Sequence, residues 1–286
     1  MKNNARVVVI GGGVVGVSTL YHLVKKGWTD CVLIERKELT SGSTWHAAGL
    51  LPLFNMSYSV GQIHKYSVDL YGRLEEETGQ YAGLSRVSNI RLATTQDRMD
   101  EYKQYAGVAQ TIGVQVDILT PDQVVDIWPL AVKDNLIGAI RHPMDGYIQP
   151  ADLTQALAKG ARDIGGQIYR NTNVTAITRT PSGEWKVTTD KGEIICEHVV
   201  SATGNFARCT GEMVGLDIPV IPVEHQYIVT EPHPAIQDRQ AKGLPEMGVL
   251  RESDGSWYMR EENGGLILGP YEVGAPVCYF DGPDDD

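Results

Sequence analysis

The sequence lacks three features that mark common classes of protein. Its four cysteines include no C-x-x-C pair, so we expect reduced, mostly buried thiols in a cytosol-like compartment rather than disulfides. Basic residues number 25 against 36 acidic ones, and the net charge of -11 argues against nucleic acid or an anionic membrane as a partner. No apolar run approaches the roughly 18 residues needed to span a bilayer. These absences favour a soluble protein with an acidic surface.

What the chain does contain is a stretch, residues 7–35, that predicts a strand, a tight turn, a helix and a second strand. Residues 7–10 form a β-branched apolar run typical of a buried parallel strand. Gly11, Gly13 and Gly16 follow at the G-x-G-x-x-G spacing of a dinucleotide-binding turn. The first glycine permits the turn, the second lets a pyrophosphate approach the backbone, and the third allows close packing of helix and strand. The amide groups at the helix N-terminus would then face the phosphates.

Glu35 ends the predicted second strand, residues 31–34. A carboxylate at this position can accept hydrogen bonds from both ribose hydroxyls of an adenosine, and it repels a 2'-phosphate. Together with the strand, turn and helix, it predicts dinucleotide binding. The alternative is a glycine-rich turn in an unrelated buried hairpin.

The N-terminus superficially resembles a secretory signal, because a charged start precedes an apolar run. We reject that interpretation, since three consecutive glycines interrupt the run and no A-x-A-like cleavage site follows. The sequence also has no arginine-rich, acid-poor presequence. We therefore expect a cytoplasmic location, with the mitochondrial matrix as the alternative for a processed protein.

The strand and helix pattern is interrupted and then resumes. Residues 89–94 predict a strand, and Thr120 to Gln123 form a capping box with proline at the first helical position. Residues 192–196 and 198–201 predict two short strands, and residues 220–230 predict a further one. We therefore predict an α/β fold in which a Rossmann-like nucleotide-binding domain is interleaved with an antiparallel-sheet substrate domain. The first comprises residues 1–88 and 149–216, and the second comprises residues 89–148 and 217–286.

A family resemblance is carried by five segments: VVVIGGGVVG, IERKELTSGSTWHAAGL, SNIRLATT, VVSATGNFA and IPVEHQYIVTE. Together they resemble the flavin-dependent dimethylglycine and sarcosine dehydrogenases, a branch of the D-amino-acid-oxidase-like superfamily. The similarity extends over essentially the whole chain, and STWHAAG is far more specific than the glycine fingerprint. The resemblance implies FAD as the cofactor, joined covalently to the histidine of STWHAAG, which is His46 here.

The residues alone argue more weakly for His46, because a histidine among small residues is more often a surface or packed side chain. The implied link is chemically reasonable, since neutral imidazole is a nucleophile at physiological pH. A small-residue turn at residues 202–204 can admit the backbone of a cofactor. With the glycine turn, Glu35 and His46, we expect the cofactor to contact Ser43, Thr44, Gly49, Val174 and Gly204.

The reaction implied by the resemblance is oxidation of an N-methyl group on a small amino acid, with N,N-dimethylglycine converted to sarcosine. A hydride leaves the methyl carbon for the flavin, and water hydrolyses the resulting iminium. His225, in EHQY, and Tyr258, in SWYMR, match active-site residues of the family. The alternatives are a strand histidine satisfied by a backbone carbonyl and a packed strand aromatic. Arg91 or Arg260 could bind the substrate carboxylate, although either is more often a structural ion-pair residue.

Full-length relatives continue beyond the position of Asp286 with a further flavin-domain segment and a domain that binds tetrahydrofolate, so we expect the substrate domain here to be incomplete. The family's dehydrogenases pass electrons to an electron-transferring flavoprotein, which is therefore an expected partner. Two alternatives stay open: a catalytically incomplete FAD-binding fragment, and a sarcosine-type dehydrogenase or oxidase. The spacing of His64, His142 and His233 does not suggest a metal site.

Overall fold

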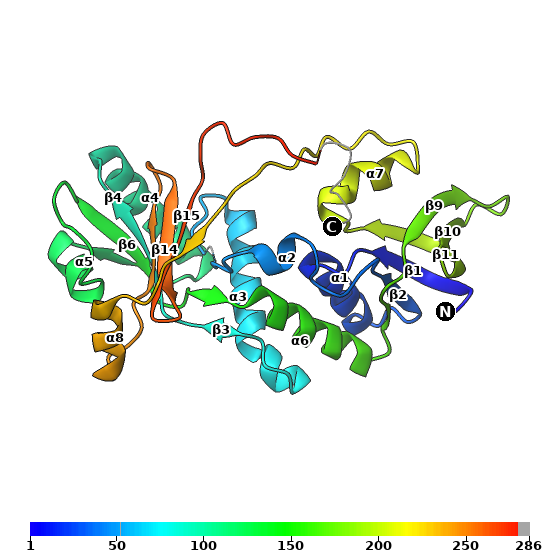
Figure 1. The fold of residues 1–286 in the computed structure, drawn as a ribbon, viewed down its shortest axis with the longest axis horizontal. Helices are drawn as coiled ribbons and strands as arrows, with labels where there is room; N and C mark the ends of the chain where they lie inside the picture. The colour runs from blue at the N-terminus through cyan, green and yellow to red at the C-terminus, as the bar shows by residue number, and fades with distance from the viewer. Residues whose placement is uncertain (52, 280–286) are drawn as a thin grey trace.

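Two large β-sheets, one in each lobe, organise the chain (Figure 1). The computed structural model describes residues 1–51 and 53–279. The mixed α/β architecture predicted from the sequence is confirmed. Within the described residues every helix is too short or too polar to cross a membrane.

The first sheet has six strands in the described part of the chain. In spatial order they are β8 (Gln167–Tyr169), β2 (Cys31–Ile34), β1 (Asn4–Ile10), β11 (Gly192–Ser201), β10 (Trp185–Thr189) and β9 (Val174–Arg179). The central strand β1 is parallel to both neighbours, and Val8 pairs with Val32 on one side and Val199 on the other. A strand in this position is covered on both faces, which explains why residues 7–10 are all buried and apolar.

Two helices pack beside this sheet, and a third packs on them and fills the space toward the second lobe (Figure 1). They are α1 (Val14–Lys25), α3 (Tyr58–Thr78) and α6 (Pro150–Asp163). Leu20, Leu74 and Leu157, one from each helix, are buried in a common hydrophobic core. Because these helices pack on one another, the glycine turn before α1 is held rigidly against the rest of the molecule.

The second sheet is mostly antiparallel and has seven strands among the described residues. In order they are β12 (Ile228–Val229), β15 (Gly265–Pro270), β14 (Trp257–Glu262), β13 (Val249–Glu252), β4 (Asn89–Ala93), β6 (Gly138–His142) and β5 (Asp117–Leu119). Only β13 and β4 run parallel within it. The remaining elements of this lobe and of the connections are α4 (Gln96–Ile112), α5 (Pro121–Ile127), α8 (Pro234–Ala241), β3 (Leu84–Ser85) and β7 (Tyr147–Ile148).

The capping box predicted at the start of α5 is confirmed. The Thr120 hydroxyl accepts a hydrogen bond from the Gln123 amide at 3.3 Å, and the Gln123 side chain accepts one from the Thr120 amide at 2.9 Å. Pro121 occupies the first helical position, where no amide hydrogen is needed. This short helix covers the second sheet beside the buried Trp128.

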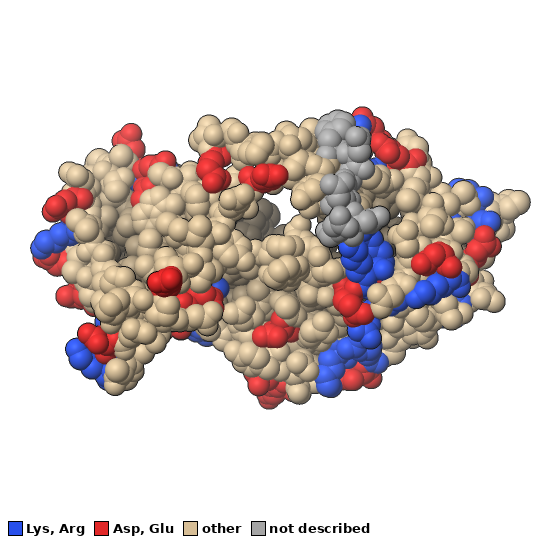
Figure 2. Space-filling model, viewed as in Figure 1, with Lys and Arg blue, Asp and Glu red and all other residues tan. Residues whose placement is uncertain are grey.

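Two extended segments, residues 213–227 and 271–279, connect the lobes along one side of the molecule; we call them the crossing segments (yellow and red in Figure 1). They meet at a bridge between Val223 and Val277, supported by the Glu224 amide donating to the Pro276 carbonyl at 3.0 Å. Figure 2 shows an opening between these segments and the body of the molecule.

Three sequence expectations differ from the structure. Most of residues 220–230 is not a strand, because only residues 228–229 find a sheet neighbour. The two strands expected at 192–196 and 198–201 are one, β11, which pairs with β10 along its first half and with β1 along most of its length. Helix α8 was not predicted. The domain division at residues 1–88 with 149–216 and 89–148 with 217–286 stays a proposal, and its last residues, 280–286, lie outside the described part.

Candidate active site

The glycine turn has no room for side chains at two of its three positions. Gly11 has φ +113°, and a Cβ there would lie 2.3 Å from the Ala202 carbonyl oxygen. A Cβ on Gly16 would lie 1.9 Å from the Gly11 carbonyl oxygen. Gly13 caps α1 without a side-chain hydrogen bond, so the first-turn amides after Val14 have no partner within the helix. This backbone cradle has the shape and the donors that a pyrophosphate requires.

Thr44 contributes a hydroxyl to the same cradle. Its Oγ1 atom accepts a hydrogen bond from the Val14 amide at 3.0 Å and lies beside Gly13, where a Cβ would be 3.0 Å away. Thr44 belongs to the one-turn helix α2 (Ser43–His46), which starts at Ser43. The STWHAAG segment is therefore attached directly to the N-terminus of α1.

Glu35 faces the glycine turn from the end of β2. Its Oε2 atom accepts from the Gly12 amide at 2.6 Å and its Oε1 atom accepts from the Lys37 amide at 2.7 Å. A carboxylate has about four acceptor positions, so two hydrogen bonds leave capacity for the hydroxyls of a ribose. The Glu35 carbonyl also accepts from the Thr172 amide at 2.9 Å, which brings the segment leading to Val174 and β9 alongside.

Gly49 and Gly204 both have a positive φ, but for different structural reasons. Gly49 has φ +73°, and a Cβ there would lie 1.9 Å from the Ile148 carbonyl oxygen, so glycine is needed to join this segment to β7. Gly204 has φ +56° and begins the short helix η1 (Gly204–Phe206), which leads into α7 (Ala207–Glu212). A Cβ on Gly204 would meet no atom within 4 Å, so the backbone is open on that side. The glycines, Glu35 and this open backbone fit an adenine dinucleotide.

His46 is exposed at the end of α2. Its Nδ1 atom lies 3.0 Å from the Gly42 carbonyl oxygen, and because a carbonyl only accepts, Nδ1 must carry the proton. The lone pair is then on Nε2. The Trp45 ring lies against the imidazole with centroids 4.2 Å apart. This orientation leaves His46 with a nucleophilic nitrogen on an accessible ring.

A cavity of about 390 Å³ brings together residues that are far apart in the sequence. Four of the predicted site residues line it: His46, Gly49, His225 and Tyr258. The rest of its lining is Ala47, Ala48, Leu50, Gln226, Tyr227, Arg251, Pro270 and Tyr271. The segment after α2, the first crossing segment and the second sheet thus converge on one site.

The rings of His225, Tyr258 and Tyr271 pack against one another in the cavity. Tyr271 contacts both His225, with ring centroids 5.3 Å apart, and Tyr258, with centroids 5.6 Å apart. Tyr258 is 7% exposed, and burial raises the pKa of its hydroxyl, so the group stays neutral at physiological pH. His225 lies 3.2 Å from Glu272 through its Nδ1 atom. A neutral phenol and an imidazole are suited to hydrogen bonding and proton transfer with a small substrate.

The cation in this cavity is neither of the two arginines considered from the sequence. Arg260 is 3% exposed and donates to the Ala48 carbonyl at 3.2 Å and to the Glu262 carboxylate at 2.6 Å. Arg91 is packed over Phe54, 4.7 Å from the ring centroid, and burial lowers its pKa to about 10. Arg251 lines the cavity instead. Its only signal in the sequence is a charge within a short apolar strand, which does not indicate which face it occupies.

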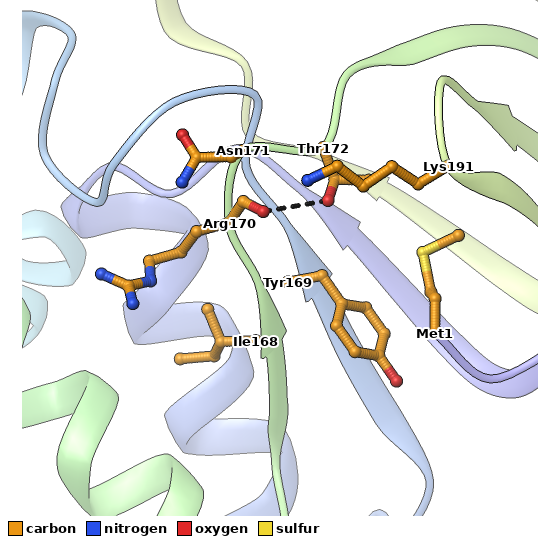
Figure 3. A pocket seen from close by; sticks show the side chains of 7 residues that line it. All are labelled: Met1, Ile168, Tyr169, Arg170, Asn171, Thr172 and Lys191. Atoms are coloured by element: carbon orange, nitrogen blue, oxygen red, sulfur yellow. Dashed lines mark hydrogen bonds between the residues drawn. The ribbon is translucent and has the colours of Figure 1, made fainter.

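A second hollow of about 360 Å³ lies at the end of β8 and contains none of the predicted site residues (Figure 3). Its lining is Met1, Ile168, Tyr169, Arg170, Asn171, Thr172 and Lys191. The Thr172 hydroxyl donates to the Arg170 carbonyl at 3.0 Å, and the Arg170 side chain is paired with Glu38. Within residues 1–51 and 53–279, no three histidine, cysteine, aspartate or glutamate side chains are grouped so as to hold a metal ion.

Sequence comparison relates the chain to named enzymes. It is 44% identical to the mitochondrial dimethylglycine dehydrogenase of Rattus norvegicus over 271 residues, which are 95% of this chain and 31% of that enzyme. It is 35% identical to the mitochondrial sarcosine dehydrogenase of Homo sapiens, over 96% of this chain and 30% of that enzyme. The resemblance inferred from the motifs is confirmed, and the chain spans about a third of the length of these relatives.

The fold comparison agrees with the sequence comparison. The crystal structure of L-proline dehydrogenase from P. horikoshii superposes with a TM-score of 0.83 at 26% identity, covering 96% of this chain and 72% of that one. The family model described as FAD dependent oxidoreductase matches residues 6–286. That match covers nearly the whole sequence, including the glycine turn and the cavity. The chain therefore belongs to the FAD dependent oxidoreductase family.

Proposed function

We propose that this chain oxidises an N-methyl group of a small amino acid with FAD, converting N,N-dimethylglycine to sarcosine and formaldehyde in one-carbon metabolism. The cavity shared by His46, His225 and Tyr258 carries the proposal. Identity of 44% to a dimethylglycine dehydrogenase, against 35% to a sarcosine dehydrogenase, supports dimethylglycine as the substrate.

The described residues support an assignment for three parts of FAD. We assign the pyrophosphate to the glycine turn with Thr44, the adenosine ribose to Glu35, and the isoalloxazine ring to the cavity at His46. Bound there, FAD supplies the acceptor for a hydride from the substrate's methyl carbon. The accessible Nε2 lone pair of His46 supports a covalent link to the ring. Ser43, Gly49, Val174 and Gly204 are assigned to the surrounding contacts.

His225 and Tyr258 prepare the substrate for hydride loss. The substrate amine must be unprotonated, because a protonated nitrogen has no lone pair to stabilise the iminium that forms. His225 accepts the amine proton at Nε2, since its Nδ1 faces Glu272. The buried hydroxyl of Tyr258 is available to hydrogen-bond the substrate.

Two measurements on purified protein test this function. Acid precipitation after FAD loading should leave yellow flavin in the pellet of the wild-type chain and none in the pellet of His46→Ala. Addition of dimethylglycine without another acceptor should bleach the flavin absorbance. A colourless wild-type pellet would refute the covalent link, and no bleaching would favour an FAD-binding fragment that is catalytically incomplete. Peroxide release when dioxygen is then admitted to the bleached protein would assign the chain as an oxidase rather than a dehydrogenase.

The wider context is also proposed, since the chain spans only 31% of the rat dimethylglycine dehydrogenase. We propose an electron-transferring flavoprotein as the electron acceptor, to be tested by its reduction in a mixture with this chain and dimethylglycine. The mammalian relatives are named as mitochondrial, which supports the matrix over the cytoplasm as the location. Cell fractionation with an antibody against the chain would decide between them.

A further inference from the structure

Arg251 is placed in the site by strand register. In β13 it pairs with Tyr258 of β14 on one side and with Arg91 of β4 on the other. Residues paired across neighbouring strands project from the same face of a sheet. Arg251 and Tyr258 accordingly both line the cavity that contains His46. The guanidinium is thus carried on the sheet, which is the rigid wall of the site.

In the described part of the chain Arg251 has no carboxylate partner, unlike two other arginines of this sheet. Arg260 is paired with Glu262, and Arg141 of β6 is paired with Asp117. Within residues 1–51 and 53–279, no carboxylate lies within ion-pair distance of Arg251. A half-buried guanidinium without a partner presents a planar pair of donors that matches a carboxylate.

The surrounding charges reinforce its positive potential. Burial, and then the neighbouring charge of Arg251, lower the pKa of Arg91 to about 10, so Arg91 stays positive at neutral pH. Asp145 is the buried acid that acts on both arginines, but burial raises its pKa to about 7. Only part of its negative charge is therefore present at neutral pH. The sheet wall that carries Arg91 and Arg251 therefore has an excess of positive charge, which a bound anion would balance.

We infer that Arg251 binds the carboxylate of the amino-acid substrate. The inference rests on the proposed function and names the residue that orients the substrate in it. Dimethylglycine has one carboxylate and one amine, separated by a single methylene group. With the carboxylate on Arg251 of the sheet, the amine and its methyl groups extend into the part of the cavity bounded by His46 and His225.

Isovalerate tests carboxylate recognition without any reaction, because it has the shape of dimethylglycine with carbon in place of the amine nitrogen. By titration calorimetry of the FAD-loaded chain, we expect isovalerate to bind at least about tenfold more tightly than its uncharged amide, isovaleramide. Arg251→Gln should weaken isovalerate binding by about tenfold or more, and Arg251→Lys by less, because lysine keeps the charge without the planar fork. The matched control Arg141→Gln, in the same sheet but outside the cavity, should leave the affinity unchanged.

Equal isovalerate affinity in the wild-type and Arg251→Gln chains would overturn the inference. So would equal binding of isovalerate and isovaleramide by the wild-type chain, a comparison that requires no variant to fold. Loss of isovalerate binding in Arg251→Gln, with no bleaching of the wild-type flavin by dimethylglycine, would retain the carboxylate site and refute the proposed reaction. Bleaching of the wild-type flavin by dimethylglycine, with unchanged isovalerate affinity in Arg251→Gln, would support the proposed reaction and refute the carboxylate site at Arg251.

Discussion

The Nδ1 atom of His225 lies 3.2 Å from the Oε2 atom of Glu272, and the two residues stand on different crossing segments. A hydrogen bond to its own backbone amide, and then the one with His225, hold the pKa of Glu272 below its usual range. Because the carboxylate accepts, it fixes the proton of His225 on Nδ1 and leaves the lone pair on Nε2. In the proposed reaction, Glu272 would thus position His225.

Replacement of Glu272 by alanine should slow flavin bleaching by dimethylglycine by roughly tenfold to a hundredfold, because the imidazole loses its orientation. Glu272→Gln should retain most of the rate, since the amide oxygen still accepts from Nδ1. Stopped-flow absorbance measures the rate, and NMR of the imidazole nitrogens reports the tautomer. The exposed neighbour Glu224 provides the control: if Glu224→Ala slows the reaction as much as Glu272→Ala, the positioning role is wrong.

Gly269 should be intolerant of alanine because Tyr258 occupies its side-chain space. The two residues pair across β14 and β15, and a Cβ on Gly269 would lie 2.2 Å from the Tyr258 hydroxyl oxygen. We expect Gly269→Ala to lower the free energy of unfolding by about 1–3 kcal/mol in urea titrations, through overpacking. In a Tyr258→Ala background the same change should cost much less. An equal cost in both backgrounds would show that the clash is not with Tyr258.

Gly16→Ala should abolish FAD binding. The added methyl group would collide with the Gly11 carbonyl and push α1 away from the turn. Gly107→Ala is the matched control: this exposed glycine lies inside α4 with no atom within 4 Å of a Cβ, so alanine should raise the free energy of unfolding by about 0.5–1 kcal/mol. Flavin absorbance after gel filtration measures the bound FAD. Normal FAD content in Gly16→Ala would contradict the assignment of the turn.

Two buried groups near the turn after β6 titrate in opposite senses. Burial raises the pKa of Asp145 from 3.8 to about 7, so its contribution to stability is complete below pH 3.8 and is lost as the pH rises to about 7. Burial lowers the pKa of His142 from 6.5 to about 3, so its contribution is complete above pH 6.5 and is lost as the pH falls to about 3. Between pH 3.8 and pH 6.5 both titrations occur, and each changes the free energy of unfolding by about 1.4 kcal/mol per pH unit, with opposite sign.

Single variants should expose these opposing slopes. Asp145→Asn should make the free energy of unfolding fall on acidification between about pH 6.5 and pH 4, because the opposing titration of Asp145 is removed and that of His142 remains. His142→Gln should make it rise over the same range. Urea titrations at several pH values measure both slopes. The double variant has neither group, so its slope over this range should match that of the wild type, in which the two titrations cancel. If both single variants also match the wild type, neither pKa is shifted.

The sequence by itself determined the elements whose signals are local. The β1, α1 and β2 unit follows from an apolar run, three glycines at fixed spacing and a terminal acid, all within residues 7–35. The start of α5 follows from the capping box at Thr120. STWHAAG made His46 a candidate for the link to the cofactor, because a family motif is contiguous. In each case, the residues that decide the structure are neighbours in the chain.

Only the tertiary structure decided which side chains share the cavity. Arg251 lies opposite Tyr258 and beside Arg91, which is 160 positions earlier in the chain, because of strand register that no local pattern specifies. Glu272 reaches His225 only because the crossing segments meet. Residues 220–227 form no strand for the same reason, since an apolar segment becomes a strand only where another backbone offers hydrogen bonds.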